Sequence, residues 1–70
     1  MTTENKAERP EPATIKATRQ AARLTPREAG ALVHASSRLW RMWEQGRHAM
    51  PLASWELFNL KLTQAGITTE

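Results

Sequence analysis

Residues 25 to 46 read TPREAGALVHASSRLWRMWEQG, and this stretch contains the strongest helix signals of the chain. Its first residues carry a helix-start signal: Thr25 as N-cap, Pro26 at the first helical position, and Glu28 as the partner of Thr25 in a capping box. Small and apolar residues follow, and the chain then meets the break HASS. The sequence therefore predicts a short helix that begins at Pro26.

A further helix is predicted over residues 37–45. Ser36 can cap its start by accepting a hydrogen bond from a backbone amide, and Gly46 suits the position after its end, where a positive φ is needed. At about 100° per residue, Trp40 and Trp43 fall on one side of this helix, and the arginines fall on the other. We expect the tryptophan side to belong to the core.

The rest of the chain also favours helices, because Ala, Leu, Arg, Glu and Gln are frequent and no run of alternating β-branched residues occurs. A first helix is expected over residues 13–22, and a fourth helix is opened by Pro51 and ended near Gly66. The predicted fold class is therefore all-α, a small bundle of four to five helices. The residues expected in its core are Trp40, Trp43, Ala29, Val33 and Leu57.

Length and composition limit the remaining possibilities. The chain has 70 residues, 40% of them hydrophobic, which allows one domain with a small core. It has no cysteine, so a disulfide framework and a thiolate metal site are excluded. No apolar run approaches the ~20 residues of a membrane span, and no signal-peptide pattern is present, so the cytoplasm is the expected compartment.

The positive charge is concentrated in the part of the chain that is expected to fold. Residues 1–12 hold three glutamates against one lysine and one arginine, and they lack apolar periodicity, so a flexible tail is expected there. Residues 13–70 hold eight lysines and arginines against four glutamates. We expect residues 13–66 to form the domain and residues 67–70 to form a C-terminal tail, and the basic balance of the domain favours an acidic partner.

Residues 24–46 resemble the helix-turn-helix of the Cro/C1-type (XRE family) regulators, whose pattern reads approximately L-T-Q-x-x-L-A-x-x-L-G-V-S-x-x-x-I-x-x-W-E-x-G. The two align without a gap, and the resemblance extends over about residues 15–62. The matching residues are Leu24, Thr25, Ser36, Trp43, Glu44 and Gly46. Apolar substitutes occupy the buried positions of the family: Ala29, Val33, Ala35 and Trp40. The resemblance implies a lambda-repressor-like bundle that contains a helix-turn-helix.

Three positions depart from the family pattern. Pro26 replaces the favoured glutamine that contacts phosphate, so this contact is expected to pass to Arg27 or to backbone amides. His34 replaces the usual turn glycine, and it is expected to adopt a left-handed or strained conformation. Arg23 stands where the family often has glycine after the first helix, so this turn is expected to be less tight.

The resemblance implies a sequence-specific regulator that binds double-stranded DNA, most simply a dimeric repressor on an inverted-repeat operator, with no cofactor and no small-molecule ligand. Small proteins of this appearance resemble bacterial and phage regulators, including anti-CRISPR-associated autorepressors and antitoxins, which act on nucleoid DNA. The family also implies a structural salt bridge between Arg19 and Glu44.

Particular residues are expected to contact DNA. Arginine pairs with guanine, serine takes either hydrogen-bonding role, and methionine contacts a thymine methyl group, so the outward residues of the helix over 37–45 are candidate base readers. They are Ser37, Arg38, Arg41 and Met42. Groups near helix ends can fix the register on phosphates without reading bases. The expected phosphate contacts are Arg27, Ser36, Arg47, His48 and Lys16.

The fourth helix carries two apolar stripes. One contains Leu52, Trp55, Phe58 and Leu62, and the other contains Ala53, Leu57 and Leu60. One stripe suffices for the core, so the other is a candidate oligomer contact. We expect a homodimer through Trp55, Phe58 and Leu62, and the alternative is that Trp55 and Phe58 only close the core of one chain.

Other classes of function are alternatives to a DNA-binding regulator. The fourth helix suits an antitoxin-like or adaptor module that binds another protein. Base stacking on exposed tryptophans, as in single-strand binders, would leave the helix over 37–45 without an inner face. Neither an enzyme nor a metal site is expected, because the sequence shows no nucleophile with a base, no glycine-rich phosphate loop and no carboxylate partner for its two histidines.

Overall fold

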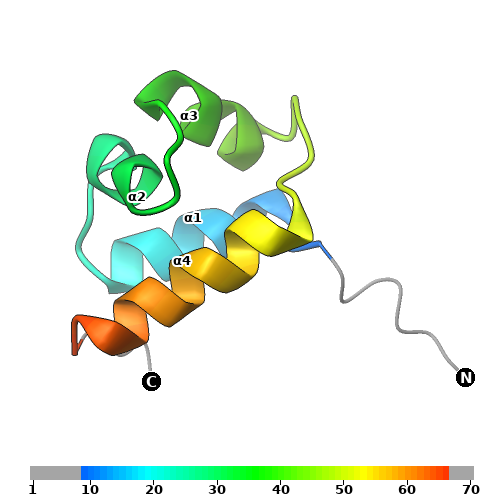
Figure 1. Ribbon diagram of the computed structural model, residues 1–70. Helices are drawn as coiled ribbons and strands as arrows, with labels where there is room; N and C mark the ends of the chain where they lie inside the picture. The colour runs from blue at the N-terminus through cyan, green and yellow to red at the C-terminus, as the bar shows by residue number, and fades with distance from the viewer. Residues whose placement is uncertain (1–8, 67–70) are drawn as a thin grey trace, which may run out of the picture.

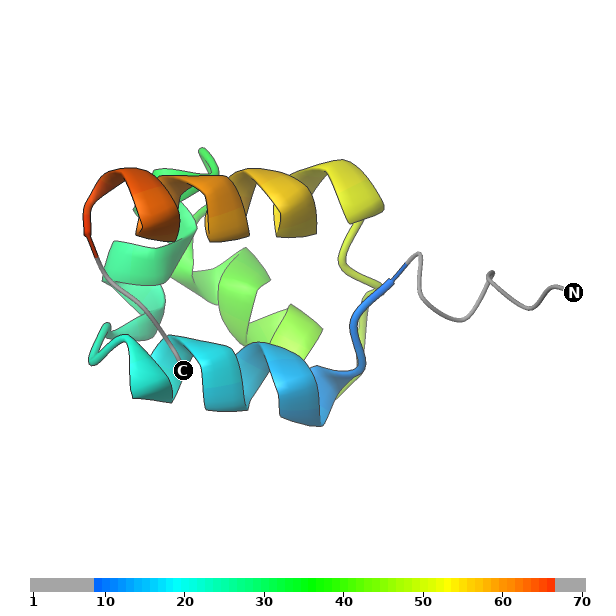
Figure 2. The same cartoon turned by 90° about the horizontal axis from the view of Figure 1, so that it is seen from below.

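A computed structural model describes residues 9–66, which form four α-helices and no strand within that range. The helices are α1 (Pro12–Ala21), α2 (Pro26–Leu32), α3 (Ser37–Gln45) and α4 (Leu52–Gln64). In Figure 1, α1 and α4 run in the same direction on one side of the molecule, and α2 and α3 cover the other side. Figure 2 shows the same arrangement from below. The predicted all-α class is confirmed.

The chain ends fall partly outside this description. The tails that were predicted over residues 1–12 and 67–70 lie outside the described residues, except for residues 9–12. The predicted boundary between tail and domain is wrong by one residue, because α1 includes Pro12 and begins one residue before the expected start. The fixed φ of proline and its missing amide suit the first helical position. Within residues 9–66, every helix is too short or too polar to cross a lipid bilayer.

The turn between α1 and α2 is tight, contrary to expectation. Arg23 has a φ of 61°, so it adopts the left-handed conformation that a glycine would take. The backbone amide of Arg23 donates to the carbonyl of Gln20 at 2.9 Å, and the amide of Leu24 donates to the carbonyl of Arg19 at 3.2 Å. These bonds close the turn directly after the helix, so the larger side chain has not loosened it.

The start of α2 is built as the sequence predicts. The amide of Glu28 donates to the Thr25 hydroxyl at 3.1 Å, and the amide of Thr25 donates to the Glu28 carboxylate at 2.8 Å. These reciprocal bonds form the capping box, and Pro26 is the first residue of the helix. Two of the backbone donors at this helix start, those of Thr25 and Glu28, are thereby satisfied.

The turn between α2 and α3 is organised around Gly30. Its carbonyl accepts hydrogen bonds from the amides of Val33 at 2.9 Å and Ala35 at 2.8 Å. A Cβ atom on Gly30 would lie 2.6 Å from the carbonyl oxygen of Ala35, so only glycine permits this approach. His34 completes the turn with a φ of 61°, which is the left-handed conformation expected in place of glycine.

The core lies between the two pairs of helices and is centred on Trp40. This side chain is fully buried; its ring centroid lies 5.5 Å from that of Trp43 and 4.8 Å from that of Phe58. The buried hydrophobic residues are Ile15, Ala22, Ala29, Val33, Trp40, Trp43, Met50, Phe58 and Leu62. Of the five residues expected in the core, four are buried, and Leu57 is only half-buried at its rim. α3 is thus held from within by large aromatic groups.

Candidate nucleic-acid interface

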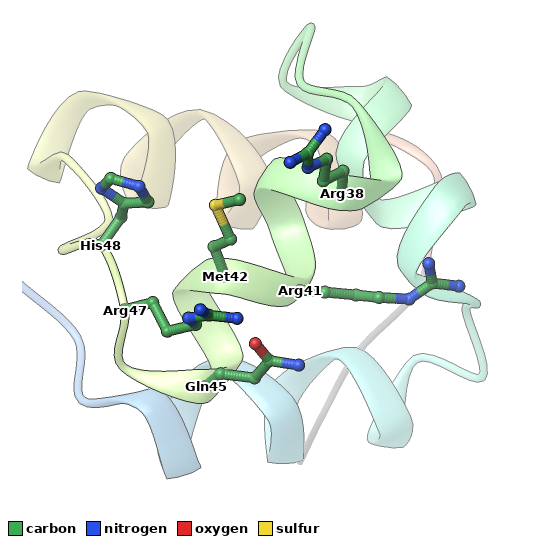
Figure 3. Close-up of a pocket in the computed structure, with 6 residues that line it drawn as sticks. All are labelled: Arg38, Arg41, Met42, Gln45, Arg47 and His48. Carbon is green, nitrogen blue, oxygen red and sulfur yellow. The ribbon is translucent and has the colours of Figure 1, made fainter.

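One exposed stripe runs along the side of α3 that faces away from the core. Arg38, Arg41 and Gln45 are all exposed, and their spacing of three and then four residues places them on one helix face. We call these three residues the outer stripe. Figure 3 shows their side chains in order along the helix, from Arg38 at its start to Gln45 at its end.

Two of the four predicted base readers lie at the margins of this stripe. Ser37 and Met42 are half-buried, whereas Arg38 and Arg41 are exposed. Gln45 was missing from the predicted readers although it follows Arg38 by seven residues, a spacing that returns to the same face after two turns. That spacing was the signal in the sequence that could have identified it.

The loop after α3 folds back against the end of the helix. Gly46 has a φ of 79°, which turns the chain. The amides of Arg47 and His48 then both donate to the carbonyl of Met42, at 2.9 and 3.4 Å. Because these bonds fix the backbone, the exposed side chains of Arg47 and His48 stay beside the outer stripe (Figure 3).

An open hollow of about 410 Å³ lies between α3 and this loop. We call it the cationic hollow, and its lining residues are Arg38, Arg41, Met42, Gln45, Arg47 and His48. None of them is acidic, and within residues 9–66 no carboxylate forms an ion pair with any of the three guanidinium groups. The hollow therefore presents unneutralised positive charge and many hydrogen-bond donors, which suits a polyanion.

A second hollow, of about 290 Å³, opens on the α1 side of α3. Its lining residues are Lys16, Arg19, Pro26, Arg41, Glu44 and Gln45. Arg41 and Gln45 line both hollows, so the C-terminal half of the outer stripe forms a ridge between them. Lys16, a predicted phosphate contact, is exposed at this second hollow.

The remaining predicted phosphate contacts lie near helix starts. Arg27 is exposed on the first turn of α2. Ser36 is exposed as well, and its hydroxyl accepts a hydrogen bond from the amide of Leu39 at 3.0 Å as the N-cap of α3. The hydroxyl of Ser36 therefore has a structural function in addition to any contact with a ligand.

A partly buried ion pair ties α3 to α1. Arg19 donates from Nε to Glu44 Oε2 at 2.6 Å and from Nη2 to Oε1 at 3.1 Å. The indole Nε1 of Trp40 donates to the same Oε2 at 2.5 Å. Nη1 of Arg19 reaches the carbonyl of Leu24 at 2.9 Å. The expected pair between Arg19 and Glu44 is present, and it also engages the central tryptophan and the turn after α1.

The charge state of Glu44 follows from these contacts. Burial alone raises the pKa of Glu44, because the charged form is desolvated. The hydrogen bonds from Arg19 and Trp40 and the positive charges of Arg19 and Lys16 outweigh burial, so the pKa of this carboxyl lies below its ordinary value of 4.5. Glu44 is therefore ionised at neutral pH and holds the guanidinium in place.

The predicted dimer contact through Phe58 and Leu62 is wrong. Phe58 is 0% exposed and Leu62 is 3% exposed, because both side chains close the core of a single chain. Trp55 is half-buried, and its ring lies 6.1 Å from that of Phe58. The other apolar stripe is the one that faces outward: Leu60 is 52% exposed, and Ala53 is exposed as well.

The interface offers positive charge and hydrogen-bond donors rather than the groups of a metal site. Within residues 9–66, no group of three or more His, Cys, Asp or Glu residues could hold a metal ion. No protein-family model matches the chain, and no curated protein matches it. The function must therefore be inferred from the arrangement of the interface itself.

Proposed function

We propose that this protein is a sequence-specific regulator that binds double-stranded DNA, with α2, the following turn and α3 acting as a helix-turn-helix. The observation that carries the proposal is the outer face of α3, where two arginines without carboxylate partners stand in the open above an inner face anchored by buried tryptophans. In this proposal α3 enters the major groove, which has the width to admit an α-helix.

The chemistry of the outer face supports both parts of DNA recognition. Arg38 and Arg41 can each donate two hydrogen bonds to O6 and N7 of a guanine. Arg47 and His48 beside the cationic hollow, and Lys16 beside the second hollow, can contact phosphates and fix the register. Positive charge flanks α3 on both sides, as the two phosphate backbones flank a major groove.

We also propose that two copies act together on an inverted repeat, as a repressor that occupies its operator. A single module of this size buries only roughly 600–1,000 Å² of protein surface on DNA, so tight and specific binding favours a pair of modules. The interface in this proposal moves to the outward stripe of α4 around Leu60 and Ala53. Replacement of Leu60 by lysine should shift sedimentation toward the monomer, whereas identical sedimentation of this variant and the parent would remove Leu60 from the interface.

A protein-interaction module is the second candidate function. Leu60 favours it, because it is the exposed large hydrophobic residue of the described chain. A stable protein partner that co-purifies without DNA, and whose binding is lost on replacement of Leu60, would support this alternative.

Selection of bound duplexes from a random DNA pool, at two salt concentrations, tests the proposed function. We expect a palindromic consensus and an affinity that falls steeply as salt increases, because each neutralised phosphate releases counterions. Bound sequences that show no consensus would contradict a sequence-specific regulator. An affinity that is independent of salt would contradict contact with the phosphate backbone.

A further inference from the structure

Gln45 is the third member of the outer stripe, and it is the one without a charge. It lies on the last turn of α3, where it is exposed, seven residues after Arg38. Among the hydrogen bonds of residues 9–66, none engages its side-chain amide, whereas the amide of Asn59 donates to the carbonyl of Trp55 at 2.9 Å. The Gln45 amide is therefore available to a ligand.

We infer that Gln45 is a specificity-determining residue that reads the adenine of an A·T base pair, an inference that rests on the proposed function. The glutamine side chain can accept from the adenine N6 amino group and donate to N7 in the major groove, a pairing that no other base offers in the same form. The outer stripe then reads two G·C pairs through its arginines and one A·T pair through its glutamine.

The position of Gln45 between two hollows favours a base over a phosphate as its target. Gln45 and Arg41 line both the cationic hollow and the second hollow, so they form the ridge that separates them. The cations that attract phosphates lie to the sides of this ridge: Arg47 and His48 on one side, and Lys16 on the other. When two phosphate backbones occupy the two sides, the ridge faces the base edges between them.

The length of the stripe sets the spacing of the bases that it reads. Seven residues of α-helix span about 10 Å, and base pairs are stacked about 3.4 Å apart, so the stripe covers about three base-pair steps when α3 lies along the groove. Gln45 lies one turn beyond Arg41. The adenine is therefore expected about two base pairs beyond the guanine that Arg41 reads, on the side away from the guanine of Arg38.

Duplex selection with three proteins tests this inference: the parent chain, Gln45→Ala and Gln64→Ala. Gln64 is the matched control, because it is an exposed glutamine on the last turn of α4. The parent is expected to select an adenine about two base pairs beyond the guanine that Arg41 reads. Gln45→Ala should lose the preference at that one position and keep the others, and it should bind the parent consensus about tenfold more weakly. Gln64→Ala should behave as the parent.

The outcomes separate this inference from the proposed function. If Gln45→Ala weakens binding to every duplex by the same factor, its target is a phosphate, and the inference is overturned. If Gln45→Ala selects the full parent consensus, the inference is also overturned, while the proposed function stands. If the parent itself selects no consensus, both the proposed function and the inference fail. Circular dichroism of the three proteins establishes that each is folded.

Discussion

α3 has nine residues, and its inner and outer sides have opposite roles. On the inner side, Trp40 is fully buried and Glu44 is held by hydrogen bonds from two other side chains. On the outer side, the side chains of Arg38 and Arg41 have no carboxylate partner within residues 9–66. A helix can therefore present unpaired cations to solvent when packing on its other side holds its orientation.

This comparison divides the expected effects of substitutions. Changes on the inner side should lower the free energy of unfolding, and changes on the outer side should leave it nearly unchanged. DNA affinity should fall in the outer variants and stay nearly unchanged in an inner variant that remains folded.

Replacement of Trp40 by alanine should have the largest effect on folding. It removes the largest buried side chain and its contacts with Trp43 and Phe58, at an expected cost of about 3–5 kcal/mol. A domain of this size has a free energy of unfolding of roughly 4–10 kcal/mol, so the loss is a large fraction of the total, and a parent near the lower end of this range would be left largely unfolded. Urea denaturation followed by circular dichroism measures the loss.

The matched outer variant is Arg38→Ala, two residues before Trp40 and on the opposite side of α3. Its free energy of unfolding should stay within about 0.5 kcal/mol of the parent value. Equal losses for Trp40→Ala and Arg38→Ala would contradict the division between the two sides.

Replacement of Glu44 by glutamine should lower the free energy of unfolding by roughly 3 kcal/mol at neutral pH, because Arg19 then keeps a partly buried charge without its partner. Since the pKa of Glu44 is lower in the folded chain than its ordinary value of 4.5, the ionised group stabilises the fold fully above that value. Its contribution is lost as the pH falls through the lower pKa of the folded state.

The pH dependence gives a second measurement on the same pair. The melting temperature of the parent should fall as the pH is lowered below 4.5, and the difference between the parent and Glu44→Gln should shrink as the carboxyl is protonated. A difference that stays constant with pH would show that Glu44 contributes nothing through its charge.

Replacement of Gly30 by alanine should lower the free energy of unfolding by about 1–3 kcal/mol. The added Cβ would lie 2.6 Å from the backbone carbonyl oxygen of Ala35, so α2 and the turn must move apart. Alanine at position 31, which is exposed on the same helix, shows that α2 accepts this residue where there is space. Chemical denaturation of Gly30→Ala with an unchanged midpoint would contradict the close approach.

Replacement of His34 by glycine should have the smallest effect, and it should stabilise the protein. His34 has a φ of 61° and an exposed side chain, so glycine relieves the steric cost of the left-handed conformation. The greater freedom of glycine in the unfolded chain offsets part of this gain, which leaves an expected increase of about 0.5–1 kcal/mol. A lower melting temperature would indicate that the histidine side chain makes a contribution of its own.

The sequence predicted the features that depend on local chemistry. The capping box at Thr25, the N-cap at Ser36 and the positive φ of Gly46 were all expected, because a few adjacent residues determine each of them. The sides of α3 could also be assigned, since its apolar and charged residues segregate sharply. The fold class followed from these elements.

The orientation of α4 could not be predicted in the same way. Both of its stripes are apolar, so periodicity alone cannot show which one faces the core. The choice depends on the shape of the space left by the other helices, and Trp40 fills that space against Phe58. The tight turn at Arg23 was missed for a related reason, because the bonds around it come from the arrangement of α1 and its end rather than from one residue type.

The affinity of Arg41→Ala for the selected duplex, measured beside that of Lys61→Ala, tests whether the outer side of α3 recognises DNA. Each variant removes one positive charge, from the outer stripe of α3 or from the last turn of α4. Arg41→Ala should bind about tenfold more weakly or worse and should lose its preference at one base pair, because a bidentate contact to guanine is lost. Lys61→Ala should keep the affinity and preference of the parent. Equal losses in the two variants, or no loss in Arg41→Ala, would contradict the assignment of DNA recognition to the outer side of α3.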